Sequence, residues 1–198
     1  MVSAEKRTLG SELFLFCITI FWGSGFAVMK IATETLSPAC IIAARYFVAA
    51  VLLVAFFFKK LKKISRPCLL GGLLLGAFNF TAMQIQTVGL KYTTAGKNAF
   101  LTAAYCVIVP FLYWVVRKKR PTAVNLISAF VCITGIGLLS IKSGFTVGFG
   151  DLLSLVSTFA FAAQIVTASI LTEKNDPILL SLCLLYTSDA ADDLLCVD

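Results

Sequence analysis

Residues 68–90 read CLLGGLLLGAFNFTAMQIQTVGL, an apolar run of 23 residues that contains no charged side chain. A helix of about 20 such residues crosses a hydrocarbon core of roughly 30 Å. Comparable runs before and after it predict six membrane-spanning helices in all, at 11–31, 38–57, 68–90, 94–116, 123–141 and 151–171. A seventh begins at Pro177 and does not complete. Because the links are short, the sequence predicts an all-α, polytopic membrane helical bundle.

The overall composition excludes several classes of protein. Of the 198 residues, 59% are hydrophobic and 14% are charged, and the mean hydropathy is +0.94. A soluble domain is about half apolar and a quarter charged, so a cytosolic enzyme is excluded. The absence of His removes the commonest general base and metal ligand. No acid lies mid-span within residues 1–182 and no CxxC pair is present. We therefore expect no enzyme activity, no metal and no cofactor.

The basic residues lie in clusters between the apolar runs. A net charge of +7 can indicate nucleic-acid binding, but this clustering is typical of membrane topology, because Lys and Arg concentrate in cytoplasmic loops. Two links carry the clusters Lys59, Lys60, Lys62, Lys63, Arg66 and Arg117, Lys118, Lys119, Arg120. We therefore expect a multi-pass bacterial cell-membrane protein with a cytoplasmic N-terminus, the lipid bilayer as a partner and no nucleic acid. Specific binding of nucleic acid or anionic lipid by the first cluster is the alternative.

A short motif occurs twice at an offset of 139 residues. The first copy is Ile31, Thr33, Glu34 and Pro38, and the second is Ile170, Thr172, Glu173 and Pro177. Each copy ends one apolar run and precedes the next. The first copy takes five spans, an odd number, to return to the same motif, so the second copy is inverted relative to the membrane. Inverted repeats recur in secondary transporters. A chance match is the alternative.

Motifs in this order resemble the EamA-type branch of the drug/metabolite transporter superfamily. They are WGSGF at 22–26, Pro38 and Arg45, GLKYTTAGKNAFL at 89–101, Pro110, the basic turn 117–121, and GDLL at 150–153. The resemblance implies ten helices in two inverted five-helix halves, with a substrate path between the halves. It predicts a complete first repeat over 8–142 and the start of the second over 149–182. It also implies an exporter or permease of small polar metabolites such as amino acids, working by alternating access.

Residues 183–198 resemble the translation of a transposon-end sequencing adapter. The run CLLYTSDAAD at 183–192 matches the adapter's constant bases, and Cys196-Val197-Asp198 matches the bases beyond its variable index. Four acids also arrive there, where a seventh span is due. We therefore expect a non-native tail on a chain truncated after its first half. A natural acidic C-terminus is the alternative.

Polar residues recur at helical spacing on the apolar spans and are the candidates for lining a substrate cavity. Together with an aromatic and a basic residue, the candidates are Trp22, Arg45, Asn79, Gln86, Asn98, Thr102, Tyr105 and Gln164. For the amides and Tyr105, packing between helices is an equal alternative. The small residues assigned to helix packing are Gly23, Gly25, Gly72, Gly76, Gly135 and Gly137.

Arg45 is the cation least able to reach the membrane surface, because it lies about two turns inside its span. It is expected to face the cavity, to pair with a polar partner or to meet a substrate carboxylate. Lys30 and Lys97 lie near the ends of spans and can reach the surface. With no mid-span acid, the cavity is expected to be neutral to positive, which favours zwitterionic or anionic solutes.

Two functions remain open at this point. The first is transport of a small polar solute, which requires the missing second half of the chain or a dimer. A dimer needs two copies in opposite orientations, and the Lys/Arg distribution opposes this. The second is a non-transporting assembly or receptor subunit, in which the polar residues bond helix to helix with no space between them.

Overall fold

The computed structural model describes residues 2–61, 64–142 and 148–193. These residues are helical throughout, apart from short links. The helices are α1 (Val2–Ala32), α2 (Pro38–Leu61), α3 (Arg66–Lys91), α4 (Ala95–Ala103), α5 (Tyr105–Arg117), α6 (Ala123–Lys142), α7 (Phe149–Leu171) and α8 (Pro177–Asp193). The prediction of an all-α helical bundle is confirmed. Lys62 and Lys63 of the first basic cluster and residues 194–198 of the tail lie outside the described residues.

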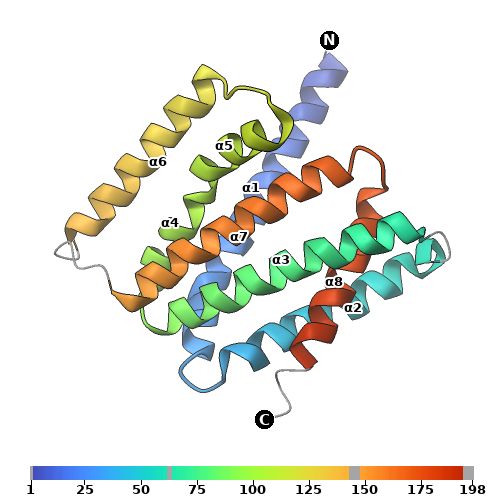
Figure 1. The fold of residues 1–198 in the computed structure, drawn as a ribbon, viewed down its shortest axis with the longest axis horizontal. Coiled ribbons are helices and arrows are strands. Elements are labelled where there is room, and N and C mark those ends of the chain that lie inside the picture. The colour runs from blue at the N-terminus through green and yellow to red at the C-terminus, as the bar shows by residue number, and fades with distance from the viewer. Residues whose placement is uncertain (1, 62–63, 143–147, 194–198) are drawn as a thin grey trace.

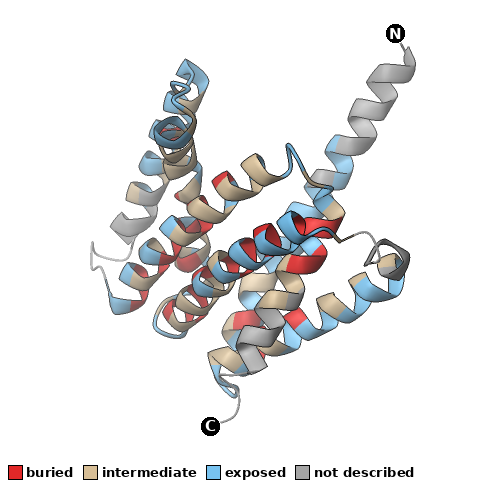
Figure 2. Ribbon diagram, turned by 45° about the vertical axis from the view of Figure 1, so that its right-hand side comes forward, coloured by how far each residue is buried: buried red, intermediate tan, exposed pale blue. Residues whose placement is uncertain are grey.

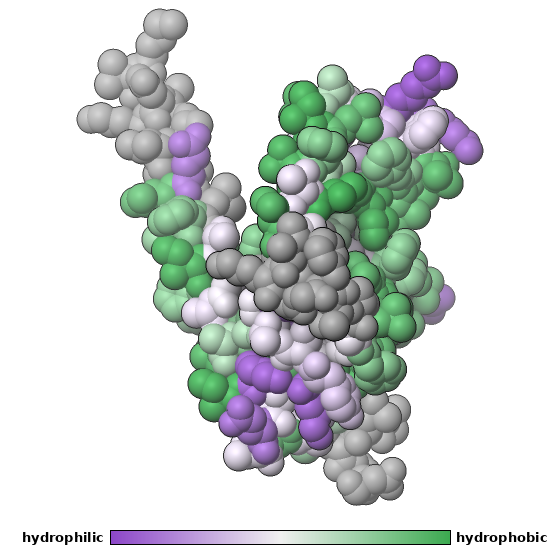
Figure 3. Space-filling model, turned by 90° about the vertical axis from the view of Figure 1, so that its left-hand side faces the viewer, coloured by the Kyte–Doolittle hydropathy of each residue, from purple (hydrophilic) through white to green (hydrophobic). Residues whose placement is uncertain are grey.

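Five segments of the described chain are long and apolar enough to cross a membrane, so this is a multi-pass membrane protein. They are Glu12–Ala32, Pro38–Phe57, Arg66–Lys91, Ala95–Arg117 and Phe149–Leu171. The predicted span at 123–141 corresponds to α6. On the face that Figure 3 shows, hydrophobic residues cover much of the coloured surface and hydrophilic residues gather mainly toward the ends.

Local sequence signals explain where several helices begin and end. Ser65 precedes α3, and its hydroxyl accepts the Cys68 N–H, while Pro67 occupies the first turn, where an N–H is not needed. Thr94 caps α4 in the same way by accepting the Lys97 N–H. Lys118 ends α5 with a left-handed backbone, at φ 58°. Polar caps thus separate apolar helices that composition alone does not delimit.

Helix α3 is the centre of the bundle. It packs most extensively against α7 and α8, and α7 also contacts α4 and α5. Helix α1 makes few contacts, mainly with α4, and α6 lies on the outside against α5 (Figure 1). Buried residues gather where the central helices meet, whereas the outer helices are mostly exposed (Figure 2). The core therefore lies between α3 and the two helices that follow residue 148.

Glycines allow the closest approach of two helices in the bundle. A Cβ added at Gly89 of α3 would lie 2.9 Å from the Gly150 carbonyl oxygen, and one at Gly150 would lie 2.5 Å from the Gly89 carbonyl oxygen. Gly72 and Gly76 of α3 face α8 just as closely. Gly135 approaches Phe100 at 3.4 Å.

The remaining glycines assigned to helix packing make no such contact within the described residues. A Cβ added at Gly23, Gly25 or Gly137 would meet nothing within 4 Å. Their packing role stays a prediction.

The segment predicted to start a second repeat forms α7 and α8, and α8 runs through Leu182 and ends at Asp193. The buried residues Leu179, Leu180 and Leu182 of α8 pack on α3 together with Cys183. The non-native origin of 183–198 and the domain limits 8–142 and 149–182 stay predictions.

Candidate functional site

The span predicted at 94–116 is broken in its middle. Helix α4 ends at Ala103 and α5 starts at Tyr105, with Ala104 between them. Pro110 lies in α5 and has no N–H to give to the Cys106 carbonyl, which weakens the helix one turn beyond the break. A neighbouring helix supplies a hydrogen-bond donor just before the break, since the Thr158 hydroxyl of α7 donates to the Leu101 carbonyl oxygen at 3.3 Å. Ala104 itself keeps right-handed helical angles, φ −59° and ψ −12°, so the interruption is confined to this one residue.

Two cavities lie on either side of Trp22. The first, of about 230 Å³, lies between α1, α2 and α3, and its wall includes Met29, Arg45 and Gln86. The second, of about 420 Å³, lies between α1 and the broken span, and its wall includes Thr102 and Tyr105. Trp22 and Phe26 line both cavities, and Trp22 is 59% exposed. The second volume falls within the usual range of small-molecule sites, roughly 300–1,000 Å³.

Arg45 extends from α2 toward α1 and is exposed at the first cavity. Its Nη1 donates to the Met29 sulfur at 2.6 Å, which is a weak acceptor without charge. No carboxylate pairs with it among the described residues. The guanidinium therefore keeps most of its donors and its full charge for an anionic group.

A network of buried polar side chains joins α3, α4 and α7 behind these cavities. Gln86 Nε2 donates to the Thr102 hydroxyl at 2.8 Å, and that hydroxyl donates to the Asn98 carbonyl. Asn98 Nδ2 donates to Ser154 Oγ at 2.7 Å and to the Gln86 carbonyl at 3.2 Å. Gln86 and Thr102 thus each line one of the cavities and also belong to the buried hydrogen-bond network. Asn98 belongs to the network and lines neither cavity.

The other candidates occupy different surroundings. Asn79 is buried and donates to the Tyr46 hydroxyl at 2.7 Å, which ties α3 to α2. Gln164 is half-buried on α7 and lines neither cavity. The structure thus brings Trp22, Arg45, Gln86, Thr102 and Tyr105 to the two cavities and leaves Asn79, Asn98 and Gln164 away from them. Solute binding by any of the eight stays a prediction.

Ion pairs hold α7 at both ends. Near its start, the Asp151 carboxylate lies 2.5 Å from the Lys97 ammonium of α4 and also accepts the Thr93 hydroxyl and the Gly148 N–H. Beyond its end, Glu173 pairs with Arg117 of α5. The first pair is nearly buried, with side-chain exposures of 14% for Lys97 and 5% for Asp151. Lys97 therefore does not extend to the surface as a free cation.

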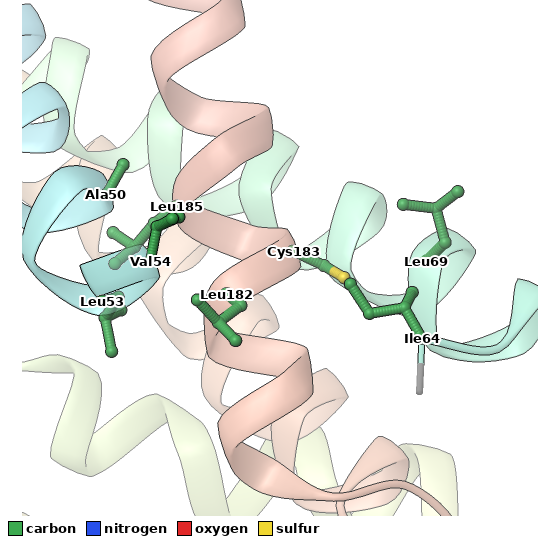
Figure 4. A pocket seen from close by; sticks show the side chains of 8 residues that line it. All are labelled: Ala50, Leu53, Val54, Ile64, Leu69, Leu182, Cys183 and Leu185. Carbon is green, nitrogen blue, oxygen red and sulfur yellow. The ribbon is translucent and has the colours of Figure 1, made fainter. Parts of the chain in front are cut away.

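A third cavity, of about 240 Å³, is entirely different in character. Figure 4 shows its lining of Ala50, Leu53, Val54, Ile64, Leu69, Leu182, Cys183 and Leu185, which come from α2, the link before α3, the start of α3, and α8. All of these side chains are apolar or nearly so, and none can orient a polar solute. The two cavities beside Trp22 are taken as the candidate site because five of the eight candidate residues line them.

Several residues of the site escape prediction from sequence. Phe26, Met29 and Met83 line the first cavity but look like ordinary apolar residues of a span. The break at Ala104 has one signal, Pro110, which lies six residues away. Tyr46 has no signal as the partner of Asn79, because the two are 33 residues apart.

Comparison with known proteins gives a consistent result. The model of the EamA-like transporter family matches residues 9–141. An uncharacterized transporter of Archaeoglobus fulgidus is 32% identical over 175 residues, which are 88% of this chain and 54% of that protein. A second uncharacterized transporter of the same organism is 29% identical over 84% of this chain and 60% of its own length. An uncharacterized protein of Haemophilus influenzae is 27% identical over 50% of this chain and 79% of its own length. No solved structure matches the chain significantly. This chain therefore spans a little over half the length of the two archaeal transporters.

Proposed function

Because the chain belongs to the EamA-like transporter family, we propose that it is part of a secondary membrane transporter, an exporter or permease of small polar metabolites such as amino acids. Transport proceeds by alternating access between two inverted repeats, of which this chain holds the first and the beginning of the second. The missing second half is its principal partner, and the solute passes between the halves. Neither an enzyme activity nor a nucleic acid is part of the proposal.

The observation that carries the substrate class is the surroundings of Arg45. Its charge faces a cavity of about 230 Å³, and among the described residues its hydrogen bond is with the Met29 sulfur. A substrate carboxylate would replace that weak acceptor with a charge-assisted, bidentate pair. The Gln86 amide and the Trp22 ring supply a polar and an apolar wall for the rest of a small zwitterion. Guanidinium, amide and indole together fit an amino acid better than a cationic drug.

The membrane and orientation follow from the same proposal. The N-terminus and the two basic links share one side, because an even number of spans separates them, and their excess of Lys and Arg makes that side the cytoplasmic side of a bacterial cell membrane. A cysteine-labelling experiment in whole cells tests the orientation. A Cys placed at Lys119 should react only after permeabilisation, and one placed at Glu34 should react in intact cells. The reverse labelling pattern would contradict it.

The test of transport uses the complete parent gene, reconstituted in lipid vesicles and screened with labelled amino acids. Arg45→Ala should abolish transport of the substrate found, while the yield of folded protein in the membrane stays unchanged. Arg45→Lys should retain part of the rate, because it keeps the charge but loses bidentate geometry. Lys119→Ala, in the exposed basic link, is the matched control. Full transport by Arg45→Ala would contradict the proposal.

The second candidate is a non-transporting assembly or receptor subunit. The sealed contact between α3 and α4 favours it, because Gln86 and Thr102 bond directly with no space between them. The cavities beside Trp22 favour transport instead. A parent protein that folds in vesicles and moves none of the screened solutes would support the second candidate.

A further inference from the structure

Helix α7 is fastened to the first repeat by one acid at each end. Asp151 in its first turn pairs with Lys97 at the start of α4, and Glu173 just beyond its last turn pairs with Arg117 at the end of α5. Between these points, Ser154, Ser157 and Thr158 are buried against the same span and α3. The first helix of the second repeat is thus joined to the α4–α5 span by one ion pair near each end.

The 139-residue offset places one acid within α1 and one just beyond its end at the same two positions. Glu12 corresponds to Asp151, and Glu34 corresponds to Glu173. Neither Glu12 nor Glu34 forms an ion pair within the part of the chain that the structure describes, and both are exposed. Between them, α1 exposes large apolar side chains, among which Phe14, Phe21 and Val28 are each at least 65% exposed. Helix α1 therefore carries the same pair of charges as α7 and the same length of apolar surface, without the partner.

We propose that Glu12 and Glu34 are the charged attachment points by which α1 docks onto the second repeat. The occupant is that repeat's copy of α4–α5. It carries a basic residue near each end, about 139 residues after Lys97 and Arg117 in the parent chain. Glu12 pairs with the first and Glu34 with the second. This inference rests on the proposed function only in requiring a parent with two repeats.

A second copy of this chain inserted in the same orientation presents its α4–α5 span antiparallel to α1, with Arg117 on the membrane side of Glu12 and Lys97 on the side of Glu34. Within this chain, however, α7 pairs with α4–α5 in parallel, start with start and end with end, through Asp151–Lys97 and Glu173–Arg117. Only an inverted copy of α4–α5 offers α1 the same parallel pairing, and it is therefore the occupant that the observed packing favours.

The first test needs only the parent's uninterrupted reading frame. Lys or Arg is expected within one helical turn of each position that aligns with Lys97 and Arg117 at the offset. This result does not depend on whether any variant folds. A parent whose second repeat lacks both basic residues would overturn the inference.

The second test is a charge exchange in the parent, followed by size-exclusion chromatography and thermal unfolding in detergent. Glu12→Lys and Glu34→Lys should each lower the unfolding temperature or abolish the monodisperse peak. Exchanging the aligned basic residue for Glu in the same protein should restore it. Lys119→Glu, a charge reversal in the exposed basic link, is the matched control and should change nothing. In the 198-residue chain, Glu12→Lys should also change nothing, because the partner is absent.

Tolerance of Glu12→Lys and Glu34→Lys in the parent, or failure of both exchanges to restore folding, would overturn the inference. Transport is not measured in either test. A parent that shows the charge exchange but moves no solute would refute the proposed function alone, and one that transports but tolerates both reversals would refute this docking alone.

Discussion

Helices α1 and α7 are the predicted first helices of two copies of one repeat, yet their surroundings differ. Their apolar segments have nearly equal mean hydropathy, 1.8 for α1 and 1.7 for α7. Only 6% of the α1 segment is buried, against 33% of the α7 segment. At equivalent positions, Phe161 of α7 is buried and packs near the ring of Tyr105, whereas Trp22 of α1 is 59% exposed. The burial of a span here reflects the partner helices present and not its own composition.

The small and polar residues of the two helices also differ in their surroundings. On α7, glycine and hydroxyl residues pack against α3 or form hydrogen bonds with α4. On α1, the glycines face open space, and Gly23 and Gly25 each line a cavity beside Trp22. The poorly packed helix is therefore the one that borders the candidate site. Matched substitutions on the two helices can test this contrast directly.

The largest difference is expected at the acids that begin the two helices. Asp151→Ala leaves Lys97 nearly buried without a counter-charge, which costs about 3–5 kcal/mol when a buried pair loses one partner. Glu12→Ala in this 198-residue chain removes an exposed acid that has no ion pair with any described residue, and it should leave stability unchanged. Thermal unfolding in detergent measures both variants. Equal unfolding temperatures for the two variants would contradict the role assigned to the pair.

A smaller difference is expected at the glycines. Gly89→Ala forces α3 away from Gly150 and should destabilise the chain by about 1–3 kcal/mol, the usual cost of an overpacked contact. Gly23→Ala meets nothing within 4 Å and should cause no loss. Denaturation by increasing SDS provides the comparison. A loss of stability for Gly23→Ala similar to that for Gly89→Ala would show that α1 is packed after all.

The smallest difference is expected at the serines. Ser154→Ala removes the Asn98 amide's acceptor across two helices and should cost about 0.6 kcal/mol, the average for a hydrogen bond between membrane helices. Ser24→Ala removes only a bond from an exposed hydroxyl to the Phe21 carbonyl of its own helix and should have no measurable effect. The same unfolding assay applies. A larger effect at Ser24 than at Ser154 would reverse the comparison.

Prediction from sequence was accurate where the physical signal is local. Long apolar runs predict helices such as α3 and α7 to within two or three residues, because the hydrocarbon core requires that length. The break at Ala104 was not predicted, since Pro110 weakens the helix but does not choose the break point. The hydrogen bonds of Asn79 with Tyr46 and of Asn98 with Ser154 also could not be predicted from sequence, because each joins residues far apart in the chain.

The candidate site shows the same division. The sequence identified Trp22, Arg45, Gln86, Thr102 and Tyr105 as unusual residues inside apolar spans, because polar groups in lipid need partners. It also listed Asn98, for which the structure shows a sealed bonding role behind the cavities. Only the relative placement of α1, α3 and α4 separates side chains that face open space from those that close a contact.

The sequence by itself determined that this chain spans a membrane as a helical bundle with basic links, because length, hydropathy and charge act locally and need no knowledge of packing. It also supplied the 139-residue repeat and the resemblance that the family match confirms. The tertiary structure alone decided that α3 is the centre, that α7 is fastened at both ends and that α1 is left with open cavities. These features arise from contacts between distant residues, and in lipid such contacts depend on close fit and on pairing of polar groups, which hydropathy does not encode.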